Sequence, residues 1–135
     1  MTRYVIDARV AIRLAVEERE IAEEHELLAP TLIRSQTLSL LHTAAVRGEI
    51  TKRVAENRLD RIGAMRIRLL GDRVLRSNAW KVADRLGWSD TYDAEYIALT
   101  VLQADAFITL DAELAASVEG VVRTAPIDDL FRANG

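Results

Sequence analysis

A chain of 135 residues, 50% hydrophobic and 29% charged, is long enough to build one substantial core, and we expect a single domain over residues 1–135. Cysteine is absent, which excludes disulfides, thiolate metal sites and cysteine nucleophiles. The formal net charge of −3 argues against a protein that coats nucleic acid through bulk positive charge. The sequence has neither a signal-peptide pattern nor an apolar run long enough for a membrane span, so we expect a soluble, cytoplasmic protein.

Short apolar runs alternate with longer amphipathic stretches, a pattern typical of a parallel sheet between two layers of helices. The fold class that we expect is therefore α/β, a three-layer α/β/α sandwich with a central parallel sheet. Strands are predicted over residues 3–6, 25–30, 65–70, 106–110 and 121–123. Helices are predicted over residues 8–17, 31–47, 51–63, 73–86 and 93–104, with Thr31, Thr51 and Asp72 as N-caps of three of them.

Three aspartates occupy positions where the chain leaves a strand or enters a helix. Asp7 ends the first strand, Asp111 follows the strand over 106–110, and Asp93 opens the helix before that strand. Ligands of open α/β sheets bind beyond the carboxyl ends of the strands, so we expect these acids to meet at one edge of the sheet.

Three carboxylates held close together repel one another until a proton or a cation neutralises them. Oxygen ligands without histidine or cysteine suit Mg²⁺ or Mn²⁺. Such an ion can polarise a phosphodiester and activate water, so the pattern favours metal-dependent phosphodiester hydrolysis. The alternative for each aspartate taken singly is an ordinary helix N-cap, a role compatible with the first.

Residues 4–8 (Tyr-Val-Ile-Asp-Ala), 92–99 (Tyr-Asp-Ala-Glu-Tyr-Ile-Ala-Leu) and 107–111 (Phe-Ile-Thr-Leu-Asp) resemble the hallmark blocks of PIN-domain proteins. They are particularly similar to those of VapC-type toxins from type II toxin–antitoxin pairs, and the resemblance covers essentially the whole chain. It implies a PIN-like fold, Mg²⁺- or Mn²⁺-dependent ribonuclease activity on RNA, a homodimer, and a cognate antitoxin that holds the enzyme inactive. We expect the tail of that antitoxin to lie in an apolar groove near the acids, with an arginine reaching them.

Within this resemblance Asp7, Asp93 and Asp111 match three of the four family acids, which act as catalytic and metal-binding residues. Thr109 matches the small hydroxyl residue that precedes the last acid. The chain departs from the pattern at Gln36, where the family has a glutamate. A carboxamide oxygen can still coordinate a cation, but it brings no negative charge, so cation affinity should fall.

Gln36 keeps a second interpretation open, a catalytically impaired PIN-like scaffold that binds a protein partner or RNA. Asp90, one helical turn before Asp93, is a possible compensating ligand, although a capping role is the simpler reading. A phosphoryl-accepting receiver domain is a third reading, but the expected acid pair after the first strand is absent, since Ala8 and Arg9 follow Asp7.

Arginines offer candidate contacts to an RNA backbone. Arg9 and Arg13 lie just after Asp7 and are the favoured phosphate contacts. A second group is more typical of a solvated face: Arg58, Arg61, Arg66, Arg68, Arg73 and Arg76. The large aromatic residues are expected in the core or at a dimer contact: Trp80, Trp88, Tyr92 and Tyr96.

Overall fold

A four-stranded parallel sheet forms the centre of the fold in the computed structural model, which describes residues 1–133. The strand order is β3-β2-β1-β4, so the first strand pairs with both the second and the last. The strands are β1 (Thr2–Ile6), β2 (His25–Pro30), β3 (Ile67–Leu70) and β4 (Ala106–Ile108). The parallel pairing of β1 with β4 confirms the arrangement expected from the sequence.

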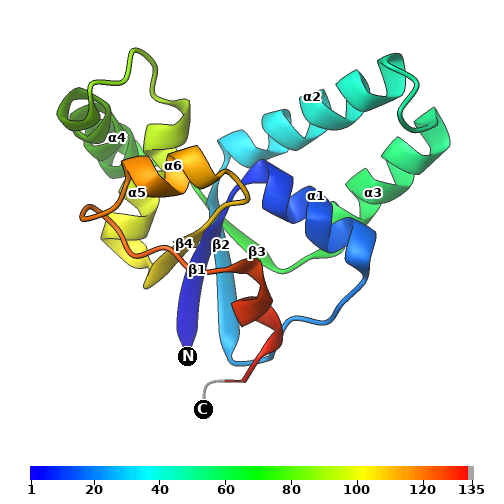
Figure 1. The fold of residues 1–135 in the computed structure, drawn as a ribbon, viewed down its shortest axis with the longest axis horizontal. Helices are drawn as coiled ribbons and strands as arrows, with labels where there is room; N and C mark the ends of the chain where they lie inside the picture. Colours follow the sequence, from blue (N-terminus) through cyan, green and yellow to red (C-terminus); the bar gives the residue numbers. More distant parts are fainter. Residues whose placement is uncertain (134–135) are drawn as a thin grey trace.

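Helices cover both faces of this sheet and complete the three-layer α/β/α sandwich (Figure 1). Helix α5 packs across β1, β2 and β4, and α4 packs along α5. On the other side α1 packs against α2 and α3, which extend away from the sheet as an arm. The helices are α1 (Ala8–Glu17), α2 (Leu32–Val46), α3 (Lys52–Ala64), α4 (Arg73–Leu86), α5 (Tyr92–Gln103) and α6 (Ala112–Ser117), with a short 3₁₀ helix η1 (Ile127–Phe131).

The core lies where β1 and β4 meet α5. Val5, Ile6, Phe107 and Ile108 are fully inaccessible to solvent, as expected for parallel strands covered on both faces. Helix α5 is buried over most of its circumference, at Ala94 and from Tyr96 through Thr100. The helix that carries Asp93 is therefore held rigidly against the strands that carry Asp7 and lead to Asp111.

Helix N-termini follow the sequence prediction except at α2. Asp72 and Thr51 accept hydrogen bonds from Leu75 N and Val54 N, as N-caps do. The predicted cap at Thr31 is wrong, because its side chain makes no capping hydrogen bond. Its backbone N–H instead donates to the Leu70 carbonyl at 3.1 Å, which ties the end of β2 to β3.

The strand predicted over residues 121–123 is also wrong. Val121 and Val122 both donate their N–H groups to the Val118 carbonyl, so this stretch is a turn after α6. Only Thr124 forms a parallel bridge with Phe107, on the free edge of β4. Pro126, which has no N–H to donate, follows two residues later and is the N-cap of η1.

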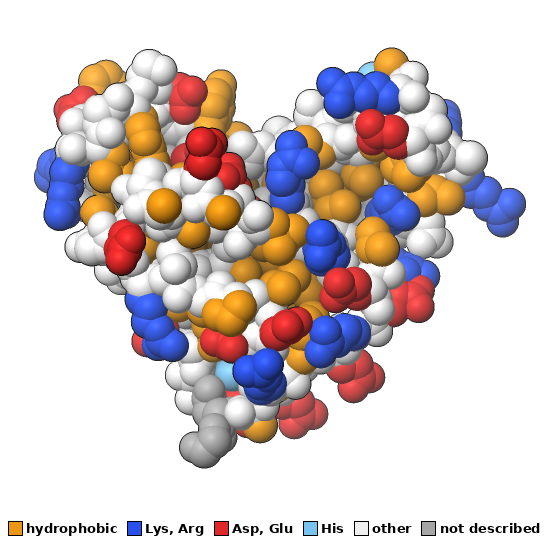
Figure 2. Space-filling view, in the orientation of Figure 1, with side chains coloured by type: hydrophobic (Ala, Val, Ile, Leu, Met, Phe, Trp, Pro, Cys, Tyr) orange, Lys and Arg blue, Asp and Glu red, His pale blue; other side chains and the backbone are white. Residues whose placement is uncertain are grey.

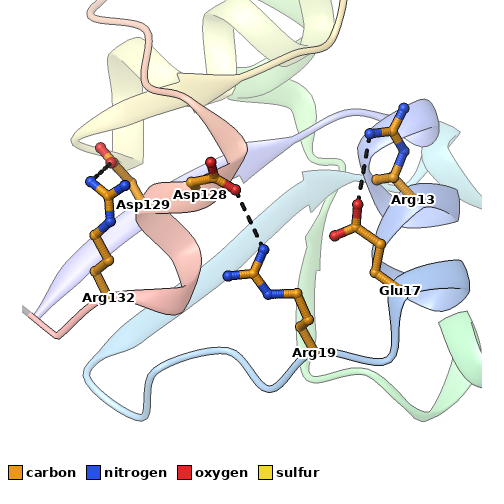
Figure 3. A network of polar contacts seen from close by, with 6 residues as sticks. All are labelled: Arg13, Glu17, Arg19, Asp128, Asp129 and Arg132. Carbon is orange, nitrogen blue, oxygen red and sulfur yellow. Dashed lines mark hydrogen bonds and ion pairs between the residues drawn. The ribbon is translucent and has the colours of Figure 1, made fainter.

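Polar contacts hold the carboxyl-terminal segment against the loop between α1 and β2 (Figure 3). Arg19 approaches Asp128 at 3.5 Å and also lies over the Phe131 ring at 3.7 Å. The Ala22 N–H donates to the Leu130 carbonyl at 2.9 Å. Among residues 1–133, no helix combines the length and apolar character needed to cross a membrane.

Truncating Phe107 tests whether β4 belongs to the buried core. We expect Phe107→Ala to lower the free energy of unfolding by about 3–5 kcal/mol, because it leaves a cavity between β4 and α5. Chemical denaturation followed by circular dichroism measures the change. Val46→Ala is the control, since Val46 is 73% exposed and its loss should cost less than about 1 kcal/mol. Similar losses for both variants would contradict the assigned core.

Candidate active site

Asp7 stands at the junction of β1 and α1 and has two roles at once. Its Oδ1 accepts the Val10 N–H at 3.1 Å, which caps α1. Its Oδ2 accepts the hydroxyl of Thr109 at 2.6 Å, although the two residues are 102 positions apart. The capping role and the predicted place at the sheet edge therefore coexist in one side chain.

Burial raises the pKa of the Asp7 carboxyl above its ordinary value. The hydrogen bonds from Thr109 and Val10 and the charge of Arg9 act in the opposite direction, whereas the charge of Asp111 raises the pKa further. The negative charge of Asp111 therefore acts on the buried Asp7 carboxylate and disfavours its ionised form.

Asp93 lies in the first turn of α5, at the same edge of the sheet. Burial is the main cause that raises its pKa, and three carboxylates raise it further: Asp7, Asp90 and Asp111. Within residues 1–133 its carboxylate has no hydrogen-bond or ion-pair partner. It is the acid of this group most available to a ligand.

Asp111 follows β4 by three positions and caps α6. Its Oδ1 accepts the N–H groups of Glu113 and Leu114 at 3.0 and 3.1 Å, and its own N–H donates to Thr109 Oγ1 at 3.2 Å. Thr109 therefore contacts both Asp7 and Asp111. The predicted supporting residue links the two acids through its hydroxyl, which donates to Asp7 and accepts from the Asp111 N–H.

One cavity of about 320 Å³ brings these residues together. Its walls include Asp7, Asp93, Asp111 and Gln36, with Arg9 beside them. It belongs to the notch between the α4–α6 side of the molecule and the α2–α3 arm, where acidic side chains gather near α6 and basic ones near α1 (Figure 2).

A second hollow of about 840 Å³ adjoins the cavity, and Asp93 and Asp111 line both. Asp90 lies in this second hollow, and its Oδ1 accepts the Tyr92 N–H at 3.3 Å. The structure thus places Asp90 beside the acids but outside the cavity that the other three share.

Gln36 faces Tyr96 across the cavity, and the Tyr96 hydroxyl donates to Gln36 Oε1 at 2.5 Å. Burial raises the pKa of Tyr96 well above its usual range, and the charges of Asp7, Glu95 and Asp93 do the same. Tyr96 is buried in the core, as its sequence position predicted, and it also lines the cavity, which was not predicted. Its spacing of three residues from Asp93 on one helix was the available signal.

The arginines predicted to contact RNA separate into different environments. Arg9 lines the acidic cavity. Arg13 pairs instead with Glu17 at 3.7 Å on the outer side of α1 (Figure 3). Arg61 hydrogen-bonds the Ala15 carbonyl and pairs with Glu18, which fastens α3 to the end of α1.

Oxygen ligands make up the donor set of the cavity, and this chemistry fits Mg²⁺ or Mn²⁺. The side chains are not already arranged as a chelate: over residues 1–133 no three His, Cys, Asp or Glu side chains form a ready metal site. Asp7 and Asp111 direct oxygens towards helix N-termini, yet each carboxylate retains unused acceptor sites.

Replacing Thr109 tests the link between the acids. Thr109→Val should raise the pKa of Asp7, because the lost hydrogen bond stabilised its ionised form. It should also lower the free energy of unfolding by about 1–3 kcal/mol at neutral pH. Carboxyl ¹³C NMR titration measures the pKa. Thr109→Ser keeps the hydroxyl and should leave the pKa near its wild-type value; an equal shift in both variants would contradict the proposed link.

Comparison with known proteins supports the fold but gives no match to the sequence itself. No family model and no curated protein matches the sequence. PAE2754 from Pyrobaculum aerophilum matches with a TM-score of 0.73 at 23% identity, over 96% of this chain and 93% of that chain. A chain of VapBC2 from Rickettsia felis, solved bound to a DNA fragment from their promoter, gives 0.65 at 7% identity, over 92% and 98%.

VapBC-1 from nontypeable Haemophilus influenzae matches with a TM-score of 0.59 at 16% identity, over 93% of this chain and 98% of that chain. These identities are low, so the likeness is one of fold. The chain has the three-layer, PIN-like α/β/α fold that its sequence motifs indicate, and it shares this fold with chains of VapBC structures.

Proposed function

We propose that the protein is a metal-dependent endoribonuclease that hydrolyses RNA phosphodiesters at Asp7, Asp93 and Asp111. The observation that carries the proposal is the single cavity lined by all three aspartates, which arrive from β1, α5 and the end of β4. Such a concentration of negative charge destabilises the folded protein unless a bound cation neutralises it.

Each aspartate would contribute differently. Asp7 is fixed in place by Thr109 and by the α1 backbone, and Asp111 by the first turn of α6. Among residues 1–133 Asp93 has no hydrogen-bond or ion-pair partner, so it would be the most adjustable of the three. Mg²⁺ or Mn²⁺ held by these carboxylates would neutralise their repulsion, polarise the phosphodiester and promote attack by water. Arg9 would hold a phosphate of the RNA at the rim.

Gln36 does not by itself favour the impaired scaffold. A neutral amide in place of a fourth acid weakens cation binding, while three carboxylates remain in the cavity. The scaffold reading would gain support only if the isolated protein failed to cleave RNA.

We further propose that the protein is a toxin restrained by a cognate antitoxin and that it works as a homodimer in the cytoplasm. The fold shared with chains of VapBC structures supports this assignment. Large apolar side chains on α4 and α5 remain exposed and are available for contact between subunits: Val74, Trp80, Val101 and Leu102.

Cleavage of a structured RNA in the presence of Mn²⁺ tests the proposed activity. We expect Asp93→Asn to lower the rate by roughly a hundredfold or more, because it removes the charge of the least constrained ligand. Asp90→Asn is the matched control on the same helix end, and its rate should stay within about threefold of wild type. Denaturing gel electrophoresis measures both rates. Absence of Mn²⁺-dependent cleavage by wild type, or full activity of Asp93→Asn, would contradict the proposal.

A further inference from the structure

The hydrogen bond between Tyr96 and Gln36 fixes which end of the Gln36 amide is available. Tyr96 is only 2% exposed, and a buried phenol hydroxyl needs an acceptor. Gln36 Oε1 is that acceptor, at 2.5 Å. The pKa of Tyr96, raised by burial, keeps the hydroxyl protonated, so Tyr96 remains a donor to Gln36.

The amino group of Gln36, in contrast, is available to a ligand. Within the described residues, 1–133, Nε2 donates no hydrogen bond to the protein, and Gln36 lines the acidic cavity. The cavity walls carry Asp7, Asp93 and Asp111, whose negative charge attracts an amino group and repels a carbonyl oxygen. The hydrogen bond from Tyr96 and the charge of the aspartates therefore favour the same orientation of the amide, with Oε1 at Tyr96 and Nε2 towards the acids.

We propose that Gln36 is a substrate-binding residue, which donates a hydrogen bond from Nε2 to a non-bridging oxygen of the RNA phosphate, and is not a cation ligand. This inference rests on the proposed ribonuclease function and assigns a new role to a position in the same site. An amide N–H is a good donor to an anionic oxygen, and hydrogen bonds to charged groups are the stronger ones. A carboxylate at this position could only repel the phosphate.

The role of Tyr96 follows from the same contact. Its hydroxyl takes one acceptor site of Oε1 and so holds this oxygen against Tyr96. Tyr96 acts through Gln36 and is a positioning residue. The aspartates would then bind the cation, while Gln36 and Arg9 would bind the RNA.

The side-chain NH₂ signals of Gln36 report this contact directly. In ¹⁵N-labelled protein they are assigned by their absence from Gln36→Glu. The titrant is a short single-stranded RNA with Ca²⁺ as the added cation, under conditions where gel electrophoresis shows the RNA intact. We expect the signals to move downfield when RNA is added and to stay in place with Ca²⁺ alone.

Two results of this titration would overturn the inference. Movement of the Gln36 NH₂ signals with Ca²⁺ alone would mean that the Gln36 amide binds the cation. RNA binding that moves backbone signals around the cavity but leaves the Gln36 amide unchanged would remove Gln36 from the substrate contacts while leaving the proposed function standing. If no RNA binds at all, the proposed function and the inference both fail.

Paired variants separate the two roles. In Gln36→Leu/Tyr96→Phe both hydrogen-bonding partners become apolar, so no buried hydroxyl is left unsatisfied. We expect roughly tenfold weaker RNA binding and a Mn²⁺ affinity within about twofold of wild type. Tyr96→Phe alone frees Oε1, so Mn²⁺ affinity should rise and RNA affinity should fall. A parallel loss of Mn²⁺ affinity in the double variant would show that Gln36 is a cation ligand.

Discussion

The parallel pairing of β1 with β4 is the constraint on which the site depends. The register sets Ile6 opposite Ile108, so the residues that leave the two strands emerge side by side. The hydrogen bond from Thr109 to Asp7 joins chain segments 102 positions apart at this edge. Because Phe107 and Val5 are fully buried in the same strands, this register cannot slip without exposing the core.

The acids at this edge stabilise local structure and at the same time oppose one another. Asp7 and Asp111 cap helices, which favours folding, while burial and mutual repulsion raise the pKa values of Asp7 and Asp93. A carboxyl whose pKa is raised by folding contributes its stability fully below its ordinary pKa and loses it as pH rises through the raised value. The neutral-pH protein therefore carries repulsion that a bound cation would relieve, as is typical of functional sites.

The sequence was informative where local chemistry decides the structure. Apolar strands ending in Asp7 and near Asp111, and caps such as Asp72, follow from composition and spacing, and the edge at which the acids meet follows from parallel strand geometry. The contact between Tyr96 and Gln36 could not be read in this way, because it joins residues 60 positions apart across two helices. The turn over residues 121–123 was misjudged because two valines favour a strand, while hydrogen bonds to Val118 decide otherwise.

Titration of Mn²⁺ into the chelator-stripped protein tests the central claim, that three aspartates form one cation site, most directly. Isothermal titration of wild type, Asp93→Asn and Gln36→Glu separates the possibilities. The account predicts binding by wild type and loss of that binding in Asp93→Asn. Binding by Gln36→Glu alone would mean that the aspartates do not suffice and that the natural protein is a scaffold without a working site. No binding by any of the three would contradict the carboxylate cluster as a cation site.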